Sequence, residues 1–270
     1  MSLYCALAAL ACAPTARAAA ARCWYENQVV VVGAEVMGVT GDFILDPATP
    51  HTELADSQAQ AAGFADTELQ GPVRLAGVTV PRAAVSVQTL DLRTGALPTP
   101  VAGVIGADVL KGYVLDVDFH PCRIRLSRPG HAPRFRALRT LPLSWIAGRP
   151  VVAAAVSDGP HAAGGGFSLG VGADTAVRVS DAAAAAPGAA KPKEAYPYGV
   201  LRPRLRAFSF AGGLVENLAS GLVAAEDPAL VGQIGAPILS RFRLRLDLAR
   251  NRLMLAAPLK ASPGGRKHVR

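Results

Sequence analysis

The sequence predicts a mostly β protein made of two similar lobes, and three observations support this fold class. Short segments in which apolar and polar residues alternate recur along the chain and are separated by turns rich in Gly and Pro, as in half-buried strands. Residues 103–126 align without a gap on residues 232–255. The segments upstream of these two copies also resemble each other, so an internal duplication covers most of the chain.

The two aligned copies have nine identical residues, and each copy predicts a glycine turn, one helical turn and a hairpin. Upstream of them, residues 29–46 parallel residues 151–170, and each segment predicts a hairpin whose second strand begins with Phe. Helix-like stretches follow at residues 53–63 and 176–186. Each lobe is therefore expected to run hairpin, short helix, hairpin, short helix, hairpin.

The duplication also sets the expected domain boundaries. Lobe 1 is expected at residues 19–126 and lobe 2 at residues 150–258. Between them, residues 127–149 are rich in Pro and Arg and lack periodicity, which predicts a linker. Residues 259–270 are basic and rich in small and polar residues, which predicts a disordered tail.

The N-terminus has the pattern of a secretory signal peptide. Residues 3–13 form an apolar run that is too short to anchor a protein in a bilayer, and Pro14 and an A-x-A site ending at Ala18 follow it. Residues 1–18 are therefore expected to be removed, which predicts a periplasmic or secreted protein with no integral membrane segment. Cys12 allows a second interpretation of the same region, as a lipidation site.

Removal of the signal peptide would leave two of the four cysteines, Cys23 and Cys122. Two cysteines in an exported chain favour one disulfide, which would tie the first strand to a later hairpin. Two buried free thiols are the alternative.

Composition excludes several other classes of protein. The net charge is +8 and the pI is near 9.7, but the arginines are scattered along predicted strands, so we expect no nucleic-acid partner. The five histidines and the cysteines lack metal-ligand spacing, and neither a dinucleotide-binding fingerprint nor a P-loop is present. We therefore expect no metal and no cofactor.

Two motifs resemble those of the retropepsin-like aspartic peptidases, in the two-lobed form found in bacteria. One is the repeated segment with Ile105-Gly106 and Ile234-Gly235, and the other is the segment around Asp46. In the second motif, the residues that match the family are Ile44, Leu45, Asp46, His51, Thr52 and Leu54. The resemblance implies a two-lobed pepsin- or retropepsin-like barrel fold with a short helix or two per lobe, and a peptide or protein as substrate or ligand.

The family's chemistry needs two carboxylates that share one proton across the lobe interface. The resemblance assigns the first to Asp46, but Gly170 stands where the second belongs. Pro47 replaces the Thr whose hydroxyl locks the two loops together in the family, and Asp174 is expected to cap a helix. Further residues are expected to contact a bound peptide, namely Thr49, Gly77, Gly170, Gly172 and Gly212. The substitutions at the two turns predict a protein that binds extended peptides between its lobes but is catalytically impaired. Because the chain holds its own second lobe, we expect a monomer.

Two other hypotheses remain open. An active aspartic endopeptidase would use Asp46 with another carboxylate, such as Asp42 or Asp108, or with a second copy of Asp46 in a homodimer. A serine hydrolase would use Ser168, because residues 166–170 match the G-x-S-x-G pattern of a nucleophile elbow.

Overall fold

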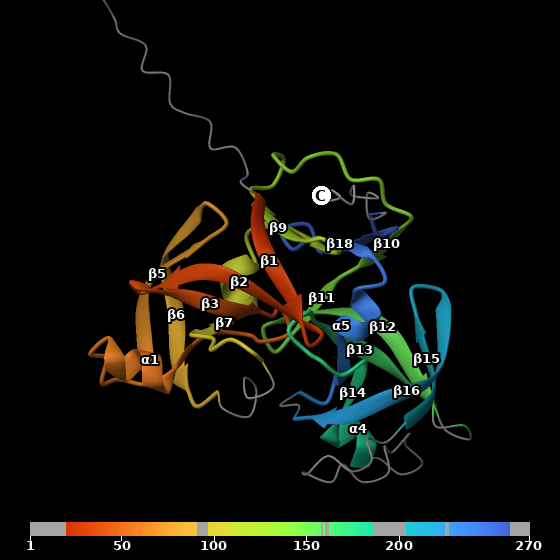
Figure 1. Cartoon of the computed structure of the whole chain (residues 1–270). Coiled ribbons are helices and arrows are strands. Elements are labelled where there is room, and N and C mark those ends of the chain that lie inside the picture. The colour runs from red at the N-terminus through yellow and green to blue at the C-terminus, as the bar shows by residue number, and fades with distance from the viewer. Residues whose placement is uncertain are drawn as a thin grey trace, which may run out of the picture.

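The computed structural model describes residues 20–90, 97–157, 159, 162–185, 204–224 and 227–259. They form two barrel-shaped lobes joined by a central sheet (Figure 1). The signal peptide and all but the first residue of the expected tail lie outside the described residues, so both stay predictions. Among the described residues, no helix is long and apolar enough to cross a membrane.

Lobe 1 is a closed barrel of six strands. In spatial order these are β2, β3, β7, β4, β6 and β5, and β5 closes the barrel by pairing with β2. The elements of this half of the chain are β1 (Ala20–Glu26), β2 (Val29–Val36), β3 (Val39–Leu45), β4 (Thr52–Ala55), α1 (Asp56–Ala61), β5 (Glu68–Leu75), β6 (Val78–Gln88), β7 (Gly103–Ile105), α3 (Ala107–Leu110), β8 (Val114–Phe119) and β9 (Cys122–Ser127).

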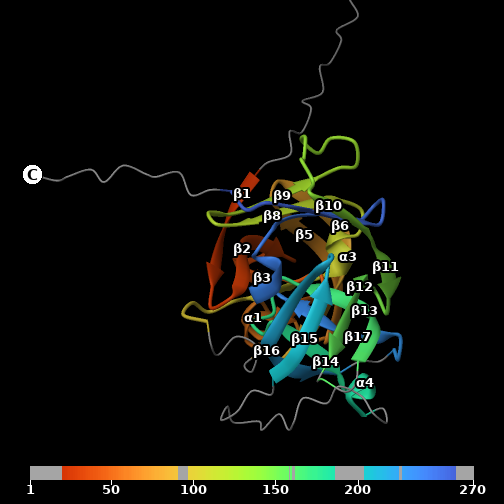
Figure 2. The ribbon, with the colours of Figure 1, turned by 90° about the vertical axis from the view of Figure 1, so that its right-hand side faces the viewer.

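Lobe 2 repeats this topology. Its barrel contains β12, β13, β17, β14, β16 and β15 in the same spatial order, and β15 closes it by pairing with β12 (Figure 2). The elements are β10 (Arg139–Pro142), β11 (Ser144–Ile146), β12 (Arg149–Ser157), β13 (Ala162–Gly170), β14 (Val177–Ser180), α4 (Asp181–Ala185), β15 (Arg204–Phe210), β16 (Gly213–Val223), β17 (Leu230–Gly235), α5 (Ala236–Leu239), β18 (Arg243–Asp247) and β19 (Arg252–Ala256). The predicted fold class, mostly β with two duplicated lobes and few short helices, is confirmed.

The structure differs from the sequence prediction in two places. The helix-like stretches at 53–63 and 176–186 begin as strands, because β4 and β14 each pair with two neighbouring strands, and helices start only at Asp56 and Asp181. Residues 127–149, expected as a linker, also contain β10 and β11. These two strands have only four and three residues, too few for alternation to be recognised.

The glycine that begins each aligned copy is required by close packing. A Cβ atom on Gly103 would overlap the backbone of Glu53 and the ring of Phe43. A Cβ atom on Gly232 would overlap the backbone of Arg178 and the ring of Phe167 in the same way. In each lobe this close approach brings β4 or β14 against the strand that carries the glycine, and so positions the loop that follows β3 or β13.

The central sheet joins the lobes about an approximate two-fold axis. Its strand order is β10, β19, β18, β8, β9 and β1, and β18 pairs antiparallel with β8 at its middle. Asp116 lies opposite Arg245 there, and these two residues are equivalent in the duplication. Arg245 donates to both carboxylate oxygens of Asp116, from Nε at 2.6 Å and from Nη2 at 2.8 Å. The axis therefore passes through a buried ion pair made of two different residues.

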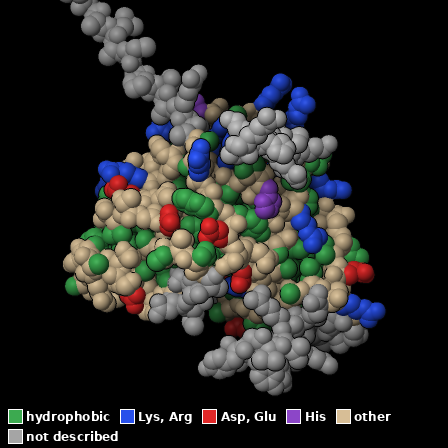
Figure 3. Space-filling view, in the orientation of Figure 1, with side chains coloured by type: hydrophobic (Ala, Val, Ile, Leu, Met, Phe, Trp, Pro, Cys, Tyr) green, Lys and Arg blue, Asp and Glu red, His purple; other side chains and the backbone are tan. Residues whose placement is uncertain are grey.

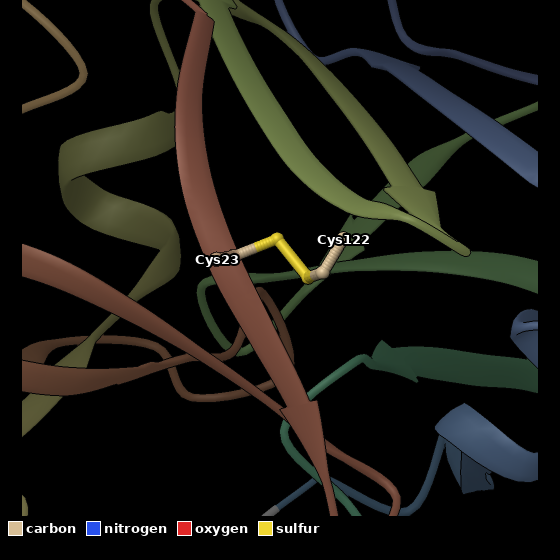
Figure 4. The surroundings of a disulfide bond; sticks show 2 residues. All are labelled: Cys23 and Cys122. Carbon is tan, nitrogen blue, oxygen red and sulfur yellow. A yellow bond between two sulfur atoms is a disulfide. The ribbon is translucent and has the colours of Figure 1, made fainter. Parts of the chain in front are cut away.

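The predicted disulfide between Cys23 and Cys122 is confirmed (Figure 4). It joins β1 to β9, which are neighbouring strands of the central sheet, although the two cysteines are 99 residues apart in the sequence. The bond therefore fastens the first described strand to the hairpin formed by β8 and β9.

Candidate functional site

Asp46 lies immediately after β3, in a tight turn at the interface of the two lobes. Its N–H donates to the carbonyl of Ile105 at 3.0 Å, and its own carbonyl accepts the N–H of Thr49, also at 3.0 Å. Only 1% of its surface is exposed. The backbone of Asp46 is thus held by β7 on one side and by its own turn on the other.

The same turn orients the carboxylate of Asp46. The N–H of Ala48 donates to Oδ1 at 3.1 Å, and the hydroxyl of Thr49 donates to Oδ2 at 3.3 Å. Thr49, expected from the resemblance as a binding residue, therefore lies against Asp46 and lines the same cavity. Hydrogen bonds from two donors restrain the carboxylate in one orientation, which suits a group that acts on a bound ligand.

Lobe 2 reproduces the backbone of this turn. The N–H of Ala173 donates to the carbonyl of Gly170 at 3.2 Å, as that of Thr49 does to Asp46. Strand register supports the same correspondence, because Phe43 pairs with Gly103 and Phe167 pairs with Gly232, three residues before each turn. Gly170 is therefore the two-fold equivalent of Asp46. The duplication has kept the backbone of the second turn without its carboxylate.

Gln233 fills the space at Gly170. A Cβ atom on Gly170 would lie only 2.6 Å from Nε2 of Gln233. The Gln233 side chain is buried, and its Oε1 has no hydrogen-bond partner among the described residues. The equivalent residue in lobe 1 is Val104. Gln233 was not among the residues predicted from the sequence, although a polar residue aligned with an apolar one inside the repeat was a signal that could have identified it.

Gly172 of lobe 2 packs directly against Asp46 of lobe 1. A Cβ atom on Gly172 would lie 2.8 Å from Cβ of Asp46 and 2.5 Å from Cγ2 of Ile44. Lobe 2 thus occupies the position beside Asp46 that a partner lobe would need. A second chain could bring its own Asp46 here only after lobe 2 had moved away, so the structure does not favour the homodimer hypothesis.

Hydrogen bonds join the two lobes near the turn that carries Asp46. The N–H of Val30 in lobe 1 donates to the carbonyl of Val171 in lobe 2 at 3.1 Å. The equivalent of Val30 in lobe 2 is Pro150, which has no N–H to donate. Instead, Nε of the neighbouring Arg149 donates to the carbonyl of Ala48 at 3.1 Å. Arg149 therefore replaces a main-chain contact between the lobes.

We expect Arg149→Met to lower the free energy of unfolding by about 1–1.5 kcal/mol, because the carbonyl of Ala48 would lose its charged donor. Arg149→Lys should be similarly destabilised, since an ammonium group cannot reproduce the planar Nε donor. Urea unfolding would measure the change, with the exposed Arg82→Met as the matched control. Equal stability of the Arg149 and Arg82 variants would contradict this role.

A cavity of about 450 Å³ lies between the lobes and is lined by residues of both. Both signs of charge contribute to it. Its charged residues and the buried glutamine are Asp46, Glu53, Arg149, Asp174, Arg178 and Gln233. Among the residues that the structure describes, no group of three His, Cys, Asp or Glu side chains could hold a metal ion.

The structure separates the glycines that were expected to contact a peptide. Gly172 lines the cavity, whereas Gly170 lies behind the side chain of Gln233. Gly77 and Gly212 lie in the tight turns between β5 and β6 and between β15 and β16, and neither lines the cavity. Gly212 instead faces the guanidinium group of Arg139 in β10. Because neither glycine lines the cavity, we leave Gly77 and Gly212 out of the proposed site.

The prediction that Asp174 caps a helix is wrong, because α4 begins only at Asp181. Asp174 precedes β14, lines the cavity, and accepts hydrogen bonds from the hydroxyl of Thr175 at 3.0 Å and from Arg178 at 3.1 Å. The carboxylates considered earlier, Asp42 and Asp108, do not line the cavity. Besides Asp46, the cavity is lined by the carboxylates of Glu53 from lobe 1 and Asp174 from lobe 2.

Ser168 is not placed as a nucleophile elbow. It lies inside β13 instead of in a turn between a strand and a helix, and 2% of its surface is exposed. Its hydroxyl lies 3.5 Å from the carbonyl of Gly232 and donates to it. The nucleophile elbow belongs to folds in which strands alternate with long helices, whereas the described residues of this chain form two β-barrels.

Comparisons with known proteins agree with this geometry. The chain resembles the solved structure of an aspartic proteinase from Irpex lacteus, with a TM-score of 0.54 and 13% identity over 89% of this chain and 97% of that one. It also resembles Basic 7S globulin from soybean, with a TM-score of 0.50 and 13% identity over 89% of this chain and 95% of that one. No family model and no curated protein sequence matches the chain. The chain therefore has the two-barrel fold of aspartic proteinases.

Proposed function

We propose that this chain is an exported, aspartic-peptidase-like protein that binds extended peptides between its lobes without cleaving them efficiently. The observation that carries the proposal is Gly170 at the two-fold equivalent of Asp46, with the side chain of Gln233 in the space of the missing carboxylate. Asp46, Thr49, Gly172 and Gln233 would form the floor of the binding site.

The loss of catalysis follows from the chemistry of the carboxylate pair. In an aspartic peptidase, one carboxylate takes a proton from water while the other gives a proton to the substrate carbonyl. Asp46 can supply one of these groups, but the amide of Gln233 does not ionise and can neither take nor supply that proton. A chain with Asp46 alone therefore lacks either its acid or its base.

Gln233 suits peptide binding for the same reason. Its amide has both donors and an acceptor, so it can pair with the N–H and C=O groups of an extended main chain. Its Oε1 is buried and has no partner among the described residues, so a rotation of the amide toward the cavity would let a ligand donate to it and would relieve the penalty of a buried acceptor without a partner. The cavity is lined by charges of both signs, so it does not select a ligand side chain of one charge. This favours recognition of the peptide main chain, which is the same in every peptide.

The test is to incubate the chain from residue 19 with a mixed peptide library between about pH 3 and 7, the range in which a carboxylate dyad works. We expect retained peptides and no new termini by mass spectrometry. Gln233→Ala should weaken binding about tenfold, the effect of one lost hydrogen-bonding group. Gln70→Ala, on the exposed side of β5, is the control. Retention that is unchanged by Gln233→Ala would contradict the proposed site.

An active peptidase is the second candidate, and Asp174 is the observation that favours it. Asp174 lines the same cavity as Asp46 and comes from the opposite lobe. In that case the library would be cleaved at acidic pH, and both Asp46→Asn and Asp174→Asn would abolish cleavage. Cleavage that survives either substitution would exclude a dyad made by these two residues.

Export is supported by the disulfide, since disulfides persist mainly in oxidising compartments. Expression of the full chain in a bacterium followed by N-terminal sequencing would test it. We expect the protein from the periplasm or medium to begin near residue 19. A protein that keeps residues 1–18 and stays in the cytoplasm would contradict export.

A further inference from the structure

A second cavity lies on one face of the central sheet and shares no residue with the cavity between the lobes. It has a volume of about 230 Å³ and is bounded by β1, β8, β9 and β18, and by residues 133–134. The segment between β9 and β10 arches over this sheet (Figure 1). On the face shown in Figure 3, Lys and Arg side chains gather along the same upper edge of the molecule.

Arginine dominates the charge of this second cavity. Five arginines and two aspartates line it, which leaves an excess of three positive charges. These residues are Asp116, Asp118, Arg123, Arg125, Arg134, Arg243 and Arg245. No other charged residue of the described chain lines it.

Two of the five arginines are neutralised and held in place. Arg245 binds Asp116, as described above, and Nε of Arg243 donates to Asp118 at 2.5 Å. The ring of Phe135 lies against both guanidinium groups, with its centroid 4.8 Å from Cζ of Arg245 and 5.3 Å from Cζ of Arg243. Ion pairs and cation–π contacts thus make a rigid wall on one side of the cavity.

The other three arginines have no acidic partner among the described residues. In the register of β8 and β9, Arg125 lies opposite Asp116 and Arg123 lies opposite Asp118, but both aspartates bind the arginines of β18 instead. Arg134 reaches the cavity from the segment above the sheet. Three guanidinium groups around one small cavity repel each other, and an anion among them would relieve that repulsion.

We propose that this cavity binds a small oxyanion that carries two or more negative charges, the class that includes inorganic phosphate, sulfate and the phosphate group of a monoester. The planar guanidinium groups of Arg123, Arg125 and Arg134 can each donate two parallel hydrogen bonds to such a group. The small volume suits a single oxyanion group. The site is separate from the cleft, so it does not depend on the proposed function.

The test is thermal unfolding and titration calorimetry of the chain from residue 19 with inorganic phosphate, pyrophosphate and sulfate, against chloride at equal ionic strength. We expect one saturable site and a rise in the unfolding midpoint as the oxyanion concentration increases. Replacing Arg123, Arg125 and Arg134 together by Gln should weaken binding by at least about tenfold. An unfolding midpoint of the same variant in chloride close to that of the unaltered chain would check that it is folded.

The matched control replaces Arg82, Arg206 and Arg241 by Gln. These three arginines are exposed and do not line the cavity, and replacing them removes the same number of charges. We expect the control to bind oxyanions as the unaltered chain does. An equal response of the two triple variants, or a response that follows ionic strength alone, would overturn the proposal.

A phosphate group could be free or part of a lipid headgroup, and vesicles distinguish these sources. Vesicles of phosphatidylcholine with and without phosphatidic acid would be sedimented with the chain. Retention on phosphatidic acid that is lost in the Arg123, Arg125 and Arg134 variant would assign the site to a headgroup. Binding of inorganic phosphate without retention on vesicles would assign it to a free anion.

Discussion

Replacing Gly170 by Asp, Ala173 by Thr and Gln233 by Val should give this chain peptidase activity at acidic pH. The three changes copy Asp46, Thr49 and Val104 of lobe 1 onto their equivalents in lobe 2. Lobe 2 already has the backbone of the turn, because Ala173 N–H bonds to the carbonyl of Gly170 as Thr49 N–H does to Asp46. The turn of lobe 2 lacks the carboxylate of an aspartate at position 170 and the hydroxyl of a threonine at position 173. The side chain of Gln233 also occupies the space that an aspartate at 170 would need.

The substitution of Gln233 is needed to make that room. A Cβ atom on Gly170 would lie 2.6 Å from Nε2 and 2.9 Å from Cδ of Gln233, so Gly170→Asp alone would have to displace the glutamine side chain. The valine side chain is shorter than that of glutamine and would leave this space free, and valine is the residue at the equivalent position of lobe 1, Val104. The N–H of Gly172, the equivalent of Ala48, would then be placed to donate to the new carboxylate.

The expected gain is about 10²–10⁴-fold in cleavage rate over the unaltered chain, the usual contribution of a positioned general acid or base. Cleavage of a peptide library at acidic pH would measure it. Two controls isolate the chemistry, namely the same triple variant with Asn in place of Asp at 170, and the triple variant with Asp46→Asn added. Activity that persists in either control would show that the two carboxylates are not the source.

Breaking the ion pair between Asp116 and Arg245 at the two-fold axis should lower the free energy of unfolding more than the substitutions of Arg149 or Arg74. Only 9% of the Arg245 side chain and 13% of the Asp116 side chain is exposed, and both carboxylate oxygens of Asp116 accept hydrogen bonds from Arg245. Asp116→Ala would leave the charge of Arg245 buried without its partner. We expect a loss of about 3 kcal/mol in the free energy of unfolding, the lower end for such pairs because some solvent still reaches them.

Urea unfolding followed by the fluorescence of Trp24 and Trp145, which lie in β1 and β11, would measure this loss. The exposed pair of Glu35 and Arg74 is the control, because the Arg74 side chain is 59% exposed. Arg74→Ala should change the free energy by less than about 1 kcal/mol. A loss for Asp116→Ala no greater than that for Arg74→Ala would show that the central pair contributes little.

The exchange of the two residues gives a sharper test. Asp116→Arg places two arginines opposite each other and should be less stable than Asp116→Ala. Adding Arg245→Asp restores a pair of opposite charges at equivalent positions, so part of the stability should return. The recovery should be incomplete, because Arg125 on β9 lies opposite position 116 and would then face an arginine. No recovery at all would mean that the two positions are not interchangeable.

The sequence by itself determined the duplicated β architecture, because alternation along strands and a repeat that aligns without a gap are local patterns that need no knowledge of long-range contacts. The choice of Asp46, and of Gly170 as its equivalent, rested on the resemblance to the retropepsin-like peptidases combined with that repeat. The pairing of Cys23 with Cys122 followed from their number, once an exported chain was assumed.

Only the tertiary structure decided what surrounds Asp46. Gln233 fills the space at Gly170 from 63 positions further along the chain, and Arg149 reaches the carbonyl of Ala48 across the lobe interface. Gly77 and Gly212 resembled binding glycines because a turn has the same local sequence wherever it points. Hydrogen bonds and packing between distant segments depend on how the two barrels meet, and a linear sequence records neither the distance nor the direction of such contacts.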